Sequence, residues 1–224
     1  MKKIVPNKLI IAFALFFAIG TLFIGCGSGG GAAEPAEIDN EVADVVVEAE
    51  DEDETEAVDE AVEEGMNTIV VITMQNGGEI EVELDSEAAP ITVANFLNLV
   101  DEGFYDGLTF HRIILGFMIQ GGDPDGTGSG GLNDKITGEF AKNGWDNPIS
   151  HKRGVISMAR TNDPNSASCQ FFITNVDAIF LDGQYAAFGH VISGMEVVDE
   201  ISAVSTDEND RPDTPVVIET IRRK

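Results

Sequence analysis

Residues 103–123 read GFYDGLTFHRIILGFMIQGGD. Two short apolar runs in this stretch, Phe110–Ile114 and Phe117–Gln120, predict two strands. Arg112 interrupts the first run. An arginine that is buried without a partner is costly, so a paired or functional role is favoured at this position. Adjacent side chains of a strand point to opposite faces, so we interpret His111 as a structural residue on the other side.

The rest of residues 67–224 predicts further short strands and two helices. The dipeptide Asn76-Gly77 between two Val- and Ile-rich runs is typical of a hairpin turn. Pro90 begins a helix with one apolar stripe, and Gly103 ends it. The other expected strands are Thr68–Met74, Glu79–Leu84, Val155–Ala159, Gln170–Thr174, Ala187–Ile192 and Val216–Ile221, and the second helix is Met195–Ile201. This pattern predicts an α+β or all-β domain, such as a barrel or sandwich with helical caps, and by itself indicates no function.

Several segments of residues 67–224 resemble the cyclophilin family of peptidyl-prolyl cis-trans isomerases, in that family's order. Residues 103–123 resemble its first signature. The other matching segments are Ala89–Phe96 for the first helix, Ser157–Arg160 with Ser168–Thr174 for the second signature, and Phe180–Gly183 with Ala187–Gly189 for the third. The resemblance implies a mainly β fold, an eight-stranded antiparallel barrel capped by two α-helices, with an external groove for a proline-containing peptide.

The resemblance also implies the residues of the site. It implies catalytic roles for Arg112 and Gln120, and substrate-binding roles for Phe117, Met118, Ala159, Arg160, Gln170, Phe172, Phe180, Leu181 and Tyr185. The chemistry of these residues suits isomerisation, because rotation about a peptide bond has a barrier of about 18–20 kcal/mol. An apolar slot can hold the proline ring, and a fixed cation can stabilise the twisted amide. No bond is made or broken, so we expect no metal and no cofactor.

Some residues near the signatures have a simpler interpretation. An aromatic side chain is more often core than pocket, so Phe171, on the opposite face of its strand from Phe172, is expected in the core. Cys169 is expected to be a small inert filler. The departures from the family's usual residues are Leu115 for Pro, Phe180 for Trp, Tyr185 for His and Arg160 for Asn. The resemblance implies weaker binding of cyclosporin-type drugs with isomerase activity retained.

Residues 1–25 have the composition of a bacterial export signal. Three lysines precede the apolar run Leu9–Ile24, which is shorter than the roughly 20 residues of a membrane-spanning helix. The segment Leu22–Cys26 resembles the lipobox of bacterial lipoproteins, which implies that Cys26 is acylated and becomes the mature N-terminus. Acylation would anchor the protein to a bacterial membrane on its extracytoplasmic side. An uncleaved signal anchor and ordinary cleavage with a free thiol are the alternatives.

Residues 26–66 contain sixteen Asp and Glu and no Lys or Arg, so −16 of the net charge of −27 lies there. Mutual repulsion predicts a disordered linker, with an amphipathic helix over residues 41–64 as the alternative. Nucleic-acid binding needs a basic face and is not expected. The expected partners are proline-containing polypeptides and, through the lipid anchor alone, a membrane. We expect a monomer.

Residues 67–224 are therefore expected to be an isomerase domain that assists the folding of exported or surface proteins. Two other functions remain open. The domain could be a prolyl-peptide adaptor or chaperone in which turnover is incidental, or the acidic linker could make the contacts of a surface adhesin. The combination of Arg112 with Gln120 favours the enzyme, because a module that only binds does not need the cation.

Overall fold

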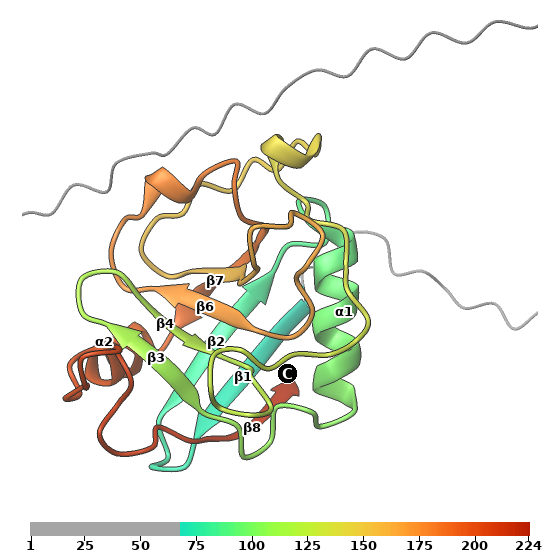
Figure 1. The fold of residues 1–224 in the computed structure, drawn as a ribbon. Coiled ribbons are helices and arrows are strands. Elements are labelled where there is room, and N and C mark those ends of the chain that lie inside the picture. Colours follow the sequence, from blue (N-terminus) through green and yellow to red (C-terminus); the bar gives the residue numbers. More distant parts are fainter. Residues whose placement is uncertain (1–67) are drawn as a thin grey trace, which may run out of the picture. The chain divides into compact units, whose positions relative to one another are not determined.

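The computed structural model describes residues 68–224. The predictions for residues 1–67, namely the signal segment, the acylated Cys26 and the acidic linker, lie outside the described residues. The described part contains the strands β1 (Thr68–Met74), β2 (Glu79–Leu84), β3 (Phe110–Ile114), β4 (Met118–Gly121), β5 (Val155–Met158), β6 (Phe171–Thr174), β7 (Ala187–Ser193) and β8 (Ile218–Arg223). Its helices are α1 (Pro90–Asp101), α2 (Met195–Ser202) and the short 3-10 helices η1 (Ala141–Asn143) and η2 (Ile179–Leu181) (Figure 1).

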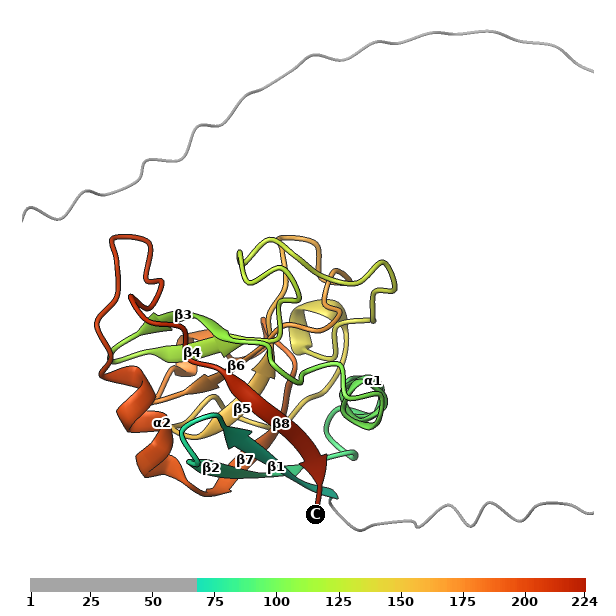
Figure 2. The ribbon, with the colours of Figure 1, turned by 90° about the horizontal axis from the view of Figure 1, so that it is seen from below.

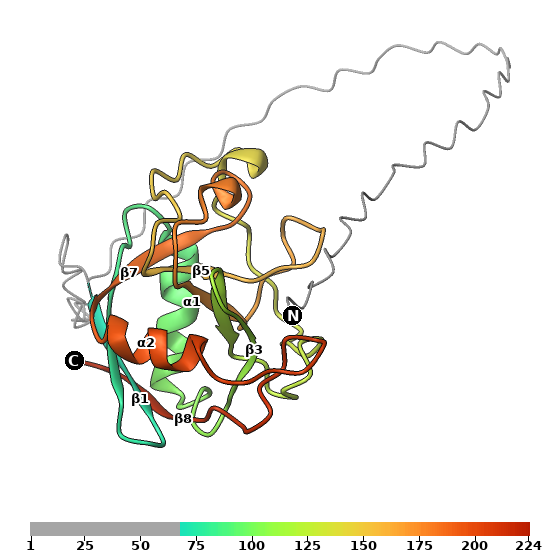
Figure 3. The ribbon, with the colours of Figure 1, turned by 90° about the vertical axis from the view of Figure 1, so that its left-hand side faces the viewer.

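All of these strands belong to one antiparallel sheet with the order β3-β4-β6-β5-β7-β2-β1-β8. The sheet curls, and α1 and α2 lie on opposite sides of it in Figure 2; Figure 3 looks onto the side that carries α2. The predicted mainly β fold, with eight antiparallel strands and two helices, is confirmed. Within residues 68–224, no helix has the length and apolar character needed to cross a bilayer.

The predicted barrel is only a half-barrel. Its edge strands β3 and β8 share no ladder, and the chain next to them forms a single bridge, Thr109–Val217. The segment before β8 divides its hydrogen bonds between two neighbours. The carbonyl of Val216 accepts from the N–H of Phe110, and the next carbonyl, of Val217, accepts from the N–H of Gln75. The β1–β8 ladder is irregular between Thr73 and Met74, and β8 begins at Ile218, not at Val216 as predicted.

The hairpin β1–β2 follows directly from its sequence. Alternate residues of β1, Val70, Ile72 and Met74, are buried, while their neighbours are partly exposed. At the turn, the side-chain oxygen of Asn76 accepts a hydrogen bond from the N–H of Gly78 at 3.1 Å. An Asn side chain that bonds the backbone two residues on favours a turn at this position. The bounds of β1 and β2 are those predicted, because alternation and turn chemistry are local properties of the chain.

Helix α1 begins at Pro90, as predicted, but its cap comes from far away in the sequence. The preceding residue, Ala89, has no side-chain acceptor for the free N–H groups of the first turn. The buried carboxylate of Glu139 supplies two acceptors, from Ile91 at 2.9 Å and from Thr92 at 2.8 Å. A negative charge at a helix N-terminus is also favoured by the helix dipole. This contact ties the loop before η1 to α1.

The two faces of β6 separate the core from the candidate site. Phe171 is fully buried, and its ring makes edge contacts with Phe96, Tyr105 and Phe110 inside the curled sheet. Phe171 is therefore a core residue, as expected. Phe172 points to the other face. There it joins a smaller apolar cluster with the buried residues Met118, Ala178 and Leu181 and the partly buried Ile114, Phe117, Ala159 and Tyr185.

Candidate active site

A cavity of about 220 Å³, which we call the slot, lies on the face of the sheet opposite to the large core. Strands β3, β4 and β6 supply its floor, and the loops after β5 and around η2 supply its walls. Its lining residues are Arg112, Phe117, Met118, Gln120, Ala159, Arg160, Phe172, Leu181 and Tyr185. Nine of the eleven residues predicted for the site therefore surround one cavity, although they are spread over more than seventy positions of sequence.

The charged side of the slot is built on strand register. Arg112 lies opposite Gln120 in the β3–β4 pair, and Gln120 lies opposite Phe172 in the β4–β6 pair. The Nη1 of Arg112 donates to Oε1 of Gln120 at 3.4 Å, and its Nε lies 3.5 Å from a carboxylate oxygen of Asp210. The guanidinium is thus held from two sides, while 44 % of the side chain remains exposed.

Gln120 is itself oriented by a chain of hydrogen bonds. Its Nε2 donates to Oε1 of Gln170 at 2.8 Å, and Nε2 of Gln170 donates to the carbonyl of Gly130 at 2.8 Å. With its nitrogen engaged in this way, Gln120 turns its oxygen toward Arg112. Gln170 does not line the slot. It lines the adjoining polar hollow beneath the Gly128–Gly131 loop and reaches the slot through Gln120.

The apolar part of the slot is made by rings and aliphatic chains. Phe172 and Met118 are almost completely buried in the floor, and Leu181 closes one side. The ring of Tyr185 meets that of Phe172 edge to face, with centroids 5.9 Å apart. Phe180 lies outside the slot and is 64 % exposed, with its ring 5.5 Å from that of Phe117. An apolar hollow beside one cation suits a proline ring whose peptide bond lies at the edge.

Comparisons with known proteins show the family of this chain. A family model described as cyclophilin type peptidyl-prolyl cis-trans isomerase/CLD matches residues 69–223. The chain belongs to this family. Peptidyl-prolyl cis-trans isomerase A of Dickeya dadantii is 44% identical over 161 residues, which cover 68% of this chain and 83% of the relative. Peptidyl-prolyl cis-trans isomerase B of Escherichia coli K12 is 42% identical over 158 residues, covering 65% and 94%. The protein is therefore a cyclophilin-type peptidyl-prolyl cis-trans isomerase.

Solved structures resemble this cyclophilin in the same region. A cyclophilin-type isomerase of Cryptosporidium parvum matches with a TM-score of 0.66 and 32% sequence identity, over 70% of this chain and 98% of that one. The same Cryptosporidium parvum protein, crystallised in the presence of the dipeptide Ala-Pro, matches with a TM-score of 0.65 and 33% identity. The likeness covers nearly the whole of that structure, so the fold of the described residues is the family fold.

Arg160 holds one wall of the slot in this cyclophilin. Its guanidinium lies over two rings, 4.7 Å from the centroid of Tyr185 and 5.0 Å from that of Phe140. Two of its nitrogens donate to the carbonyl of Gln184, at 2.9 and 2.7 Å, and a third donates to the carbonyl of Thr161. Arg160, at a position where the family often has Asn, therefore stabilises the part of the wall that contains Gln184 and Tyr185.

Sequence reasoning missed three side chains behind the floor of the slot. His151, Ser157 and Asp182 form a hydrogen-bonded chain, with Nδ1 of His151 2.8 Å from Asp182 and Nε2 3.0 Å from the hydroxyl of Ser157. Burial lowers the pKa of His151, although the hydrogen bond with Asp182 opposes that shift. Ser157 and Asp182 fall inside the second and third signatures, which is the only signal of their importance in the sequence. His151 has no such signal, because its partner Asp182 is 31 residues away.

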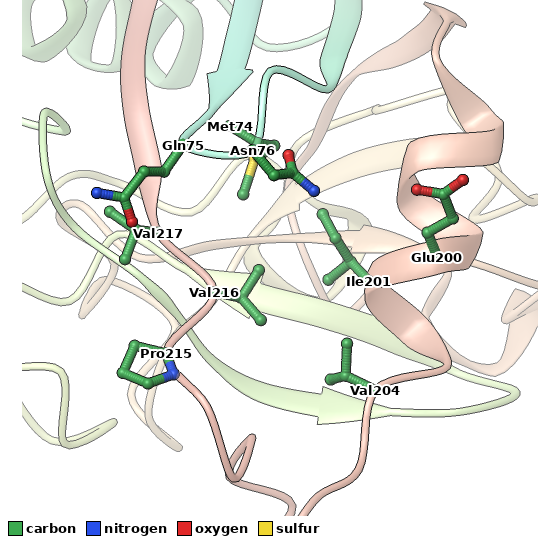
Figure 4. A pocket seen from close by; sticks show the side chains of 9 residues that line it. All are labelled: Met74, Gln75, Asn76, Glu200, Ile201, Val204, Pro215, Val216 and Val217. Carbon is green, nitrogen blue, oxygen red and sulfur yellow. The ribbon is translucent and has the colours of Figure 1, made fainter.

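A second hollow lies away from the slot, between the end of α2 and the chain that leads into β8 (Figure 4). Its lining residues are Met74, Gln75, Asn76, Glu200, Ile201, Val204, Pro215, Val216 and Val217. They include no aromatic ring and no cation, so this hollow lacks both parts of a prolyl site. In the part of the chain that the structure describes, no group of three or more His, Cys, Asp and Glu side chains is arranged to hold a metal ion.

Proposed function

We propose that this isomerase accelerates X–Pro bond rotation in exported or surface polypeptides and so assists their folding. The observation that carries the proposal is that one cavity is lined by the guanidinium of Arg112 and the apolar ring of Phe172. Both lie opposite Gln120, in the two strand pairs on either side of it. A Cryptosporidium parvum relative was crystallised in the presence of the dipeptide Ala-Pro, which supports a proline-containing ligand.

The proposed mechanism needs only positioning and one cation. The proline ring sits on Phe172 and Met118, with Leu181 beside it, and the preceding peptide bond lies next to Arg112. As the C–N bond twists, amide resonance is lost and the nitrogen lone pair becomes localised. A guanidinium N–H stabilises that state more than the planar amide, which accelerates rotation. Gln120 holds Arg112 in place and binds substrate backbone. No covalent intermediate and no cofactor is required.

The test is an isomerisation assay of a short Ala-Pro peptide with the full chain. Arg112→Ala should lower kcat/KM by about a hundredfold, since a hydrogen bond to a charged group contributes about 1.5–3 kcal/mol. Arg112→Lys should recover only part of the loss, because the ammonium lacks the planar fork of donors. Arg222→Ala is the matched control, because Arg222 lies on β8, is similarly exposed and pairs with Asp106. Peptide binding without turnover, unaffected by Arg112→Ala, would instead support an adaptor.

The location is a separate part of the proposal and depends on the sequence of residues 1–66. We infer that Cys26 is acylated after export and that a monomeric isomerase domain is held to a bacterial membrane by that lipid, without binding nucleic acid. The support is the LFIGC segment after a basic start and an apolar run. The mass of the mature N-terminus tests it: a diacylated or triacylated Cys26 is expected, and an unmodified Cys26 or an uncleaved Met1 would refute it.

A further inference from the structure

The chain of His151, Asp182 and Ser157 lies directly behind the slot. His151 and Ser157 are buried, at 1 % and 0 % exposure, and the His151 ring stacks on Phe172 with centroids 6.1 Å apart and planes 16° apart. An acid, an imidazole and a hydroxyl in this order can activate a nucleophile. Ser157 lies in the middle of β5, however, where no substrate reaches it. The group therefore acts inside the protein and not as a hydrolytic site.

We infer that Asp182 and His151 form a latch that holds residues 178–185 against the sheet and thereby positions the slot for its peptide. This inference rests on the proposed function of the slot, and it makes both residues positioning residues for isomerisation. Residues 178–185 carry Phe180, Leu181 and Tyr185, which are the wall and the outer rim of the predicted site.

The attachment is concentrated on one carboxylate. Oδ1 of Asp182 accepts hydrogen bonds from the backbone N–H of His151 at 2.7 Å and from its ring at 2.8 Å. Oδ2 accepts from the hydroxyl of Ser150 at 2.6 Å. The carbonyl of His151 in turn accepts from the N–H of Ala178 at 2.7 Å. Residues 150–151 therefore hold both the start and the middle of the segment that forms the wall.

The other end of the segment is held independently. The N–H of Lys142 donates to the carbonyl of Gly183, and Arg160 donates to that of Gln184. Leu181 lies between Ala178 and Asp182, the two residues that residues 150–151 hold. Loss of the latch should therefore move Leu181 away from Phe172 without unfolding the segment, which opens the slot and weakens its hold on a proline ring.

The direction of the hydrogen bonds defines the tautomer of His151. Burial disfavours ionisation of Asp182, but its bonds from the His151 backbone, Ser150 and the His151 ring outweigh this and leave its pKa below the ordinary value. An ionised Asp182 only accepts, so the proton of the neutral ring is on Nδ1. Nε2 then accepts from the hydroxyl of Ser157. The ring is fixed at both nitrogens and at its face, where it lies on Phe172.

Two substitutions at residue 151 separate the latch from the rest of the ring. In His151→Asn the amide nitrogen falls near the place of Nδ1 and can still donate to Asp182, whereas in His151→Gln it falls near the place of Nε2 and cannot. Both variants lose the stacking on Phe172 equally. Asp182→Asn removes the acceptor charge with little change of shape. His190→Gln is the control, because His190 is half exposed on β7 and contacts Glu83.

The full chain is assayed with an Ala-Pro peptide, with thermal unfolding measured alongside. For His151→Gln and Asp182→Asn we expect KM to rise about five- to tenfold with a smaller change in kcat, and for His151→Asn less than about a twofold rise. In ¹⁵N NMR of the unsubstituted chain, the His151 nitrogens should report an Nδ1–H tautomer. They should shift when the peptide is added, while those of His190 should not.

Three results would overturn the latch. They are equal KM values for the two His151 variants, effects on KM that merely follow the loss of thermal stability, and an Nε2–H tautomer of His151. If the unsubstituted chain neither binds nor turns over the peptide, the proposed function fails instead. The latch is then judged by hydrogen exchange: faster exchange at the amides of Ala178 and Leu181 in Asp182→Asn supports it, and unchanged exchange refutes it.

Discussion

The guanidinium of Arg160 lies 4.7 Å from the centre of the Tyr185 ring and donates two hydrogen bonds to the carbonyl of the residue before it, Gln184. One side chain thus fixes both the ring and the backbone of that wall. Residues 150–151 hold the same wall at Ala178 and Asp182, so it is attached at more than one point.

Arg160→Ala should raise KM for an Ala-Pro peptide about two- to tenfold, because a cation over an aromatic ring contributes about 0.5–2 kcal/mol. Arg160→Lys should show a similar loss, since an ammonium cannot stack on Tyr185 and bind a carbonyl at once. Lys142→Ala is the control, because the Lys142 ammonium donates to the side chain of Gln184 and not to its carbonyl. An Arg160→Ala variant with unchanged KM would show that Tyr185 needs no support.

Gln120→Ala should lower kcat/KM about tenfold or more, because it removes the side chain that connects Arg112 to Gln170. Gln170→Ala should have a smaller effect in the same direction, since Gln170 acts only through Gln120. Steady-state kinetics with one peptide measures both. Gln75→Ala, in the hollow of Figure 4, serves as control and should leave kcat/KM unchanged. A larger loss for Gln170→Ala than for Gln120→Ala would contradict the order of this chain.

Neighbouring phenylalanines of β6 should respond differently to the same substitution. Phe171→Leu should lower the free energy of unfolding by about 1–3 kcal/mol, since its ring is surrounded by other rings in the core. The kcat/KM of the folded protein should not change. Phe172→Leu should lower kcat/KM by about tenfold, because it alters the floor of the slot. Denaturant unfolding and peptide assays of both variants test the pair, and equal effects on activity would contradict it.

Stability should fall as the pH drops below about 6.5. Burial lowers the pKa of His111; the nearby Asp123 opposes this shift, whereas Arg211 and Arg112 add to it. Burial also lowers the pKa of His151, where Asp182 opposes the shift. The unfolded chain, with an ordinary histidine pKa near 6.5, therefore binds more protons than the folded one at lower pH. The two buried histidines therefore leave the free energy of unfolding at its full value above that pH, and the free energy of unfolding decreases as the pH falls below it.

Urea unfolding at several values between pH 5 and pH 8 measures this dependence. His111→Phe, which keeps a ring in the same buried place on β3, should reduce the slope between pH 5 and pH 7. A free energy of unfolding that stays constant over this range, or that rises as the pH falls, would contradict the prediction.

Gly122→Ala should destabilise the fold by about 2–4 kcal/mol. Gly122 has φ +82°, and a Cβ there would lie 2.5 Å from the carbonyl oxygen of Cys169. That oxygen also accepts a hydrogen bond from the hydroxyl of Tyr105 at 3.0 Å, so it has little freedom to move. Gly107→Ala is a control, since φ there is also positive but a Cβ meets nothing within 4 Å. Equal losses for the two variants would show that backbone strain alone matters.

The local elements of this protein follow from the sequence by itself. The bounds of β1, β2 and β3 are predicted correctly, because side-chain alternation and the Asn76-Gly77 turn act within a few residues. The start of α1 at Pro90 is local for the same reason. The candidate site residues were available from the sequence only through the family resemblance, since spacing alone indicates no function.

Other features were decided only by the tertiary structure. Glu139 caps a helix 48 residues away, and Asp182 meets a histidine 31 residues away. The edge strands β3 and β8 share no ladder, and only the bridge Thr109–Val217 joins the chain beside them. No local pattern records such pairings, because the chain brings these groups together only when the apolar faces of the sheet and helices are buried. The shape of the slot, unlike the identity of the strands, is therefore a property of the folded chain.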